Sequence, residues 1–282
     1  MFRIFILIGF TYLFLHLHAT GDISKYINMK YSYISEMAIY IFIAFTIICI
    51  YNYMKKEKND HNHHSSCDHC GHNHANEENT WWKRTFTFGI LLLPVFTGLF
   101  FPVATLDSNI VAKKGLYFPV YDEGDEYSQR QFLQPNTSSY YGKEGYAELM
   151  DKGLEKLANK ETITLQEDNF LNDLETIYNY PGQFLGKTVT LTGFTFHENE
   201  QTKNELFLLR FGIIHCIADS GVYGILLSIP EDIKTDNDQW LEVTGTLDSL
   251  YYQSYKKTLP ILHVTEWKSI AEPKDPYVYR QY

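Results

Sequence analysis

The chain has 282 residues and a formal net charge of −10 at pH 7, with histidine counted as neutral. From Asp107 onward it carries 27 acidic and 16 basic residues, a net charge of −11, so the acidity belongs to the C-terminal part. An acidic surface is repelled by phosphate backbones, so we expect no nucleic-acid partner. The sequence contains no nucleophile–base pair, P-loop or glycine-rich dinucleotide motif. We therefore expect that the protein is not an enzyme.

Three apolar stretches predict membrane spans within residues 1–106. The first, at about 2–18, is short and has a basic start, as a signal peptide would, but no small-residue cleavage site follows, which favours a retained span. The second, 34–54, and the third, 86–106, are long enough to cross about 30 Å of hydrocarbon. Residues 81–84 precede the third span as an aromatic and basic interface anchor. We therefore expect a multi-pass protein of the cell membrane, embedded in its lipid bilayer.

The loop between the second and third spans, residues 55–85, contains a dense tract of histidine and cysteine. Six of the eleven histidines and two of the four cysteines lie at 61–74, and no apolar residue interrupts them. Imidazole nitrogen and thiolate sulfur suit zinc, so the tract predicts reversible Zn²⁺ binding. Two alternatives remain open: a solvated polar loop, and a thioredoxin-like redox pair, which would need a βαβ context. The predicted metal ligands are His61, His63, His64, Cys67, His69, Cys70, His72 and His74.

Basic residues in the short loops predict the orientation in the membrane. The loop between the first two spans holds only Lys25 and Lys30. The loop between the second and third spans holds Lys55, Lys56, Lys58, Lys83 and Arg84. Because basic loops stay in the cytoplasm, the histidine- and cysteine-rich loop is predicted to be cytoplasmic and the chain after residue 106 extracytoplasmic.

The extracytoplasmic part is predicted to begin with a linker and two helices. Residues 107–140 are polar with scattered glycine and proline, which predicts a linker. Apolar residues at helical spacing predict one helix near 144–159. A second helix is predicted to begin with a capping box at Thr164 and Glu167 and to stop at Pro181. Its apolar face consists of Phe170, Leu171, Leu174, Ile177 and Tyr178.

Five short segments rich in β-branched and aromatic residues then predict strands. They lie at 187–197, 205–214, 222–229, 240–247 and 261–267. Five strands of this size favour a small closed barrel of the oligonucleotide/oligosaccharide-binding (OB) type over about 186–267. Gly193 and Gly245 fit the bends that such a barrel needs. The predicted fold class is three transmembrane helices followed by a soluble α+β domain, residues 141–282, with an OB-like barrel.

A second candidate metal site lies after the second predicted strand. His215, Cys216 and Asp219 are three ligand types within five positions. Adjacent strand residues face opposite ways, so His215 and Cys216 could share one ion only at a strand end or a bulge. The alternative is a buried Cys216, an exposed His215 and a simple turn at 219–221.

A third candidate site lies at the expected outer membrane face. His16 and His18 end the first span, and Glu36 begins the second. Ionisable groups at this depth either extend toward the lipid headgroups or line an ion path. The sequence leaves both interpretations open.

The stretch from Arg210 to Asp219, together with the three apolar spans and the histidine-rich loop, resembles the YcgQ family of Bacillus-type bacteria. The matching residues within the stretch are Arg210, Phe211, Cys216, Ala218 and Asp219. His215 stands where the family often has a second cysteine, a change that keeps metal-ligand character. The resemblance covers nearly the whole chain. It implies a multi-spanning permease as partner and a link to zinc homeostasis.

Two functions are compatible with these observations. The first is an accessory subunit of a permease that handles zinc or a similar transition metal. The second is a metal-responsive membrane sensor or assembly factor whose extracytoplasmic barrel binds a protein partner. Three spans with little internal polarity do not form a pore alone, so the first function requires a partner or an oligomer.

Overall fold

The computed structural model describes residues 2–60, 80–101, 106–116, 118, 137–198, 204–230 and 235–281. The eight predicted metal ligands at 61–74 lie outside these described residues. The chain divides into two compact units. The N-terminal unit comprises Met1–Ser24 and Met29–Ala104, and the C-terminal unit comprises Lys25–Asn28 and Thr105–Tyr282. A short segment between the first two helices therefore belongs to the C-terminal unit.

The N-terminal unit contains helices α1 (Phe2–Thr20), α2 (Ser32–Asp60) and α3 (Thr80–Phe100). By length and composition, the stretches Phe2–Thr20 and Met29–Lys55 could cross a membrane. This confirms two apolar helices at the first two predicted spans. The third prediction, 86–106, corresponds to a shorter apolar helical stretch, Thr85–Phe100.

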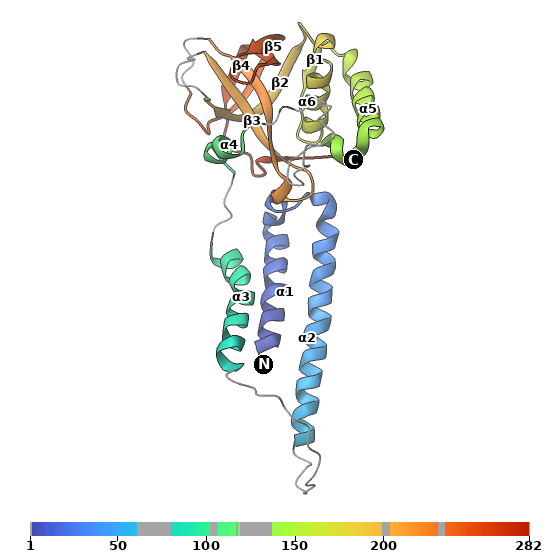
Figure 1. Ribbon diagram of the computed structural model, residues 1–282, viewed down its shortest axis with the longest axis vertical. Coiled ribbons are helices and arrows are strands. Elements are labelled where there is room, and N and C mark those ends of the chain that lie inside the picture. Colours follow the sequence, from blue (N-terminus) through green and yellow to red (C-terminus); the bar gives the residue numbers. More distant parts are fainter. Residues whose placement is uncertain are drawn as a thin grey trace. The chain divides into compact units, whose positions relative to one another are not determined.

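Helix α1 packs against both α2 and α3 (Figure 1). Small residues allow the close approach of α1 and α3: a Cβ added at Gly98 would lie 2.8 Å from Leu13 Cδ1. Phe42 of α2 contacts the rings of Phe10 and Phe14, at centroid distances of 5.8 and 6.0 Å. Most other apolar side chains of α2 remain exposed. Helices that pack through small residues and expose apolar side chains are typical of a bilayer environment.

The C-terminal unit begins with a helix inside the stretch predicted as a linker. Helix α4 (Ser108–Lys114) follows Asp107, whose carboxylate accepts a hydrogen bond from Ile110 N as an N-cap. Val111 is buried in the core of this unit. Helix α5 (Thr137–Ala158) has a break at Gly142, and its later part confirms the helix predicted near 144–159.

The second predicted helix forms as α6 (Phe170–Asn179), and every residue of its predicted apolar face is buried. The predicted capping box is wrong. Thr164 instead lies in strand β1 (Thr162–Thr164), where it pairs with Thr190. The helix begins at Phe170, and its N-cap residue is Asn169. Burial of Ile163 in this strand explains the difference, because pairing with the sheet places that apolar side chain in the core.

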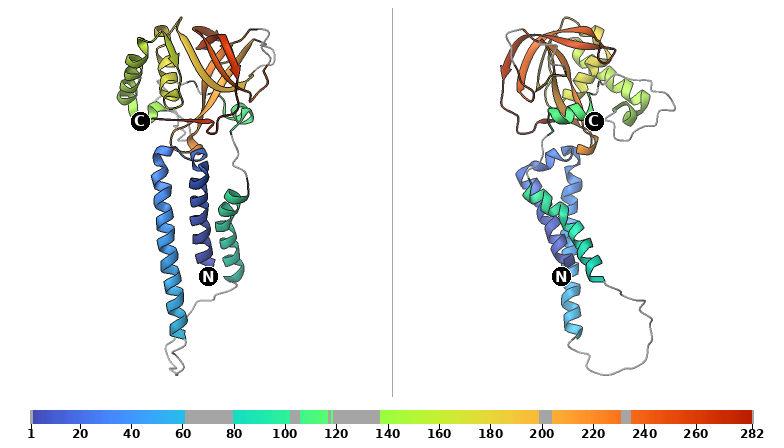
Figure 2. Two further views of the ribbon diagram at one scale, coloured as in Figure 1. Left: turned by 180° about the vertical axis from the view of Figure 1, so that it is seen from behind. Right: turned by 60° about the vertical axis from the view of Figure 1, so that its left-hand side comes forward.

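All five predicted strands form, and two of them are longer than predicted. They are β2 (Thr188–Phe196), β3 (Glu205–Ile213), β4 (Gly221–Ser228), β5 (Trp240–Tyr252) and β6 (Lys257–Ser269). Pairing runs β2-β5-β6-β4-β3, and β3 pairs again with β2, so the five strands form a closed ring. The sequence did not reveal β1 beside β2 or β7 (Tyr277–Tyr279) beside β3. Figure 2 shows α5 and α6 on the same side of these strands.

Two glycines permit close approach between neighbouring strands. The β5–β6 register shifts between Thr244 and Gly245, as the predicted bend at Gly245 requires. A Cβ added at Gly224 would lie 2.0 Å from Leu208 O on the adjacent strand β3. No side chain fits at that distance without moving the backbone of one strand.

We therefore predict that Gly224→Ala lowers the stability of the protein by about 1–3 kcal/mol, the usual cost of overpacking. The measurement is the thermal midpoint of the purified full-length protein. Gly182→Ala is the matched control, because a Cβ at Gly182 would meet nothing within 4 Å. Equal midpoints for the two variants would contradict the close approach of β3 and β4.

Candidate functional site

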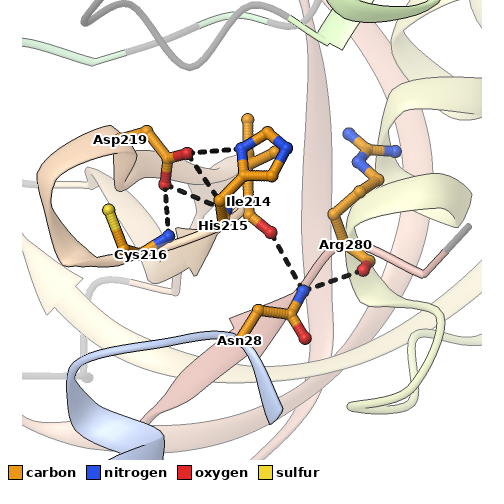
Figure 3. A network of polar contacts seen from close by, with 6 residues as sticks. All are labelled: Asn28, Ile214, His215, Cys216, Asp219 and Arg280. Carbon is orange, nitrogen blue, oxygen red and sulfur yellow. Dashed lines mark hydrogen bonds and ion pairs between the residues drawn. The ribbon is translucent and has the colours of Figure 1, made fainter. Parts of the chain in front are cut away.

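Three segments that are distant in the sequence meet in the C-terminal unit. They are Lys25–Asn28, the turn at residues 214–219 after β3, and the C-terminal tail at residues 276–280. We call these three segments the junction. Figure 3 shows the polar contacts that join them. The turn contains all of the second candidate metal site and most of the stretch that resembles a known family.

Asn28 joins all three segments. Its side chain is 3% exposed, and Nδ2 donates hydrogen bonds to Ile214 O at 3.0 Å and to Arg280 O at 3.1 Å (Figure 3). Its backbone N–H donates to His215 O at 2.9 Å. Next to it, Ile27 pairs with Cys216 as an antiparallel bridge. A buried amide that satisfies two carbonyl groups fixes the positions of both, because breaking either bond leaves a desolvated carbonyl.

The turn is held by the carboxylate of Asp219. It accepts the backbone N–H of His215 at 3.0 and 3.1 Å and that of Cys216 at 3.0 Å. The ring Nδ1 of His215 lies 2.7 Å from Asp219 Oδ2. This contact is a hydrogen bond to the carboxylate in the tautomer that carries a hydrogen on Nδ1. Cys216 and Asp219 also form a capping box around the short 3₁₀ turn Ile217–Asp219.

The structure brings His215, Cys216 and Asp219 together, but in a turn whose carboxylate already accepts several hydrogen bonds. Within the described part of the chain, no group of three or more His, Cys, Asp or Glu residues could hold a metal ion. The third candidate site is only partly assembled. His18 Nε2 lies 2.8 Å from Ser35 Oγ and Nδ1 lies 4.0 Å from Glu36 Oε1, whereas His16 stacks against Tyr12.

Two buried arginines hold the tail in place, a role that the sequence did not indicate for either of them. Arg210 Nε donates to Pro276 O at 3.1 Å, and Nη2 donates to Tyr277 O at 3.3 Å. Its guanidinium lies 5.1 Å from the ring centre of Trp240, within cation–π distance. Burial lowers the pKa of Arg210 from its usual value.

The second arginine, Arg280, forms a buried ion pair with Glu175 of α6, and both side chains are almost fully inaccessible to solvent. Arg280 also donates to Asn172 Oδ1 of the same helix. The sequence signal for this pair was two acidic residues, Asp173 and Glu175, on the apolar helix and a single arginine in the aromatic tail. No sequence pattern indicated that Glu175 and Arg280, which are 105 positions apart, would form a pair.

Helix α4 is attached to the same turn. Lys114 Nζ donates to Ser220 O at 2.8 Å and to Ser220 Oγ at 2.9 Å. Burial lowers the pKa of Lys114, and the nearby charge of Asp219 acts in the opposite direction. The junction is therefore built from hydrogen bonds and ion pairs between chain segments, which suits the joining of those segments better than the binding of a substrate.

Two long apolar helices followed by a folded sheet domain define a two-part protein of membrane type. The chain belongs to the DUF1980 family: the DUF1980 N-terminal domain matches residues 2–117 and the DUF1980 C-terminal domain matches residues 140–280. It is 48% identical to "UPF0703 protein YcgQ" of Bacillus subtilis (strain 168), over 99% of both chains. The resemblance to the YcgQ family is thereby confirmed.

A second relative carries a functional name. The chain is 34% identical, over 99% of each protein, to the "Putative two-component membrane permease complex subunit" of Streptococcus mutans serotype c. Among solved structures, an asparaginyl-tRNA synthetase of Entamoeba histolytica is 25% identical over 32% of this chain and 22% of its own. Its TM-score of 0.21 is too low to support any conclusion about fold or function.

Proposed function

We propose that this protein is a membrane-bound accessory subunit of a permease that handles zinc or a related transition metal. The observation that carries the proposal is the relative named as a subunit of a membrane permease complex, which matches this chain over 99% of its length. The apolar helices of the N-terminal unit support a membrane location. In this role the protein itself catalyses no reaction and requires a multi-spanning permease as its partner.

In the proposed topology the chain crosses the membrane three times. Lys25–Asn28 belong to the C-terminal unit, so the connection between α1 and α2 must lie on the same side of the membrane as that unit. If α2 crosses the membrane, the chain must cross back before α4 joins the C-terminal unit. Helix α3 is the proposed returning span, and its apolar stretch Thr85–Phe100 provides about 24 Å at 1.5 Å per residue. The basic residues of the 55–85 loop then favour a cytoplasmic loop and an extracytoplasmic C-terminal unit.

For the C-terminal unit we propose an OB-type barrel that serves as a docking domain. The ring order β2-β5-β6-β4-β3 and the parallel pair β4–β6 support this architecture. OB-type barrels commonly bind nucleic acids, but the net charge of −11 from Asp107 onward opposes such a ligand. A protein partner is therefore the proposed ligand of the domain.

The first test concerns the topology. Protease added to cells stripped of their wall is expected to digest the C-terminal unit and to remove an epitope tag at residue 282. A tag placed in the 55–85 loop should survive until the membrane is permeabilised. Protection of the C-terminal tag in intact cells would reverse the proposed orientation.

The second test concerns transport. Cells with the permease but without this chain are expected to accumulate radiolabelled zinc at an altered rate, and the chain alone, without the permease, should not restore the normal rate. Unchanged zinc accumulation, combined with an altered transcriptional response to zinc, would favour a metal-responsive sensor over a transport subunit.

The third test concerns the histidine- and cysteine-rich loop, for which we propose reversible Zn²⁺ binding. The full-length protein is titrated with zinc against a competing chelator. Cys67→Ser with Cys70→Ser should weaken binding while the histidines retain part of it, and affinity should fall as pH drops below about 6.5, because protonated imidazole cannot ligate. Cys216→Ser, outside the loop, is the matched control. An affinity that is unchanged by the loop substitutions would contradict the proposal.

A further inference from the structure

The backbone carbonyl and the guanidinium of Arg280 contact different parts of the C-terminal unit. Its carbonyl oxygen accepts a hydrogen bond from the Asn28 side chain at 3.1 Å (Figure 3). Its guanidinium pairs with Glu175 and donates to Asn172, both on α6. Arg280 therefore contacts both the segment that connects α1 to α2 and helix α6.

The ion pair between Arg280 and Glu175 is difficult to break because both charges are buried. Arg280 is 1% exposed and Glu175 is 0% exposed, so each charge depends on the other for compensation. Removing one partner from a buried ion pair leaves an uncompensated charge, which is strongly unfavourable. The guanidinium therefore cannot leave α6 while Glu175 stays buried and ionised.

The backbone of the tail is fixed as well. The N–H of Arg280 donates to Ile213 O at 3.1 Å, and β7 pairs in parallel with β3 at residues 211–213. Ile213 directly precedes the turn that carries the two other acceptors of Asn28, Ile214 O and His215 O. A shift of the tail therefore moves the acceptors of Asn28, and a shift of Asn28 moves the tail.

We propose that the C-terminal tail couples the connection between α1 and α2 to helix α6, so that the two respond as one conformational unit through Arg280. Lys25–Asn28 follow α1 and precede α2 in the chain, and they are the first of the two parts that the proposed coupling joins. The inference rests on the contacts of the C-terminal unit alone. It would stand even if the permease role were wrong.

The experiment is site-resolved hydrogen exchange on the full-length protein. Glu175→Gln removes the charge partner of Arg280 without touching Asn28. Exchange of the Asn28 and Ile217 amides, which donate to His215 O and Tyr26 O, is expected to accelerate about 10-fold. Unchanged exchange at these two amides would overturn the coupling.

Thr195→Val is the matched control. Thr195 is as buried as Glu175, and its hydroxyl donates to Asp236 O, but none of its hydrogen bonds involves the junction. It is expected to accelerate exchange near residues 236–239 and to leave Asn28 unchanged. Equal acceleration at Asn28 in both variants would show that global unfolding is the route, and it would also overturn the proposal.

A second variant, which perturbs Asn28 and measures exchange at Arg280 and α6, keeps the test decisive if Glu175→Gln fails to fold. Asn28→Ala leaves the buried ion pair in place and is expected to accelerate exchange at the Arg280 amide and in α6, while the long β5–β6 hairpin keeps its wild-type rate. Acceleration restricted to residues 25–28 would show that the two regions open independently.

Discussion

The buried ion pair between Arg280 and Glu175 constrains much of the C-terminal unit. Two opposite charges removed from water must stay together, so the last residues of the chain cannot separate from α6 without a large cost in free energy. The tail in turn extends the sheet beside β3, where Arg210 holds two of its carbonyl groups. The C-terminal tail is therefore part of the domain core. It also positions the turn after β3, because the N–H of Arg280 donates to Ile213 O directly before that turn.

Asn28 links this core to the N-terminal part of the chain. It is the only member of the Lys25–Asn28 segment that the structure describes as a buried polar residue. Its amide and backbone N–H satisfy three carbonyl oxygens of the C-terminal unit. This segment is continuous in sequence with α1 and α2, so the C-terminal unit is assembled from two separate parts of the chain, one before α2 and one after α3.

The two groups of candidate metal ligands differ in their chemical setting. His215 and Asp219 are engaged in a turn with defined hydrogen bonds, so their arrangement accounts for the shape of the chain without an ion. In the sequence, no apolar residue interrupts the eight predicted donors at 61–74. The turn therefore has a structural role in the junction, and zinc binding is proposed only for the histidine- and cysteine-rich loop.

The sequence by itself determined the apolar helices, the five strands and the buried face of α6, because each depends on a local period of apolar residues. The resemblance of the chain to the YcgQ family was also recognisable from the sequence, and the whole-length identity to a member of that family confirms it. The sequence did not reveal β1 or β7, which are three residues long and too short for a periodic signal. It misplaced the start of α6, because pairing of Thr164 with β2 overrode a local capping pattern. The partners of Asn28, Arg280 and Glu175 were decided only by the tertiary structure, since a buried polar contact depends on which distant segments the fold brings together.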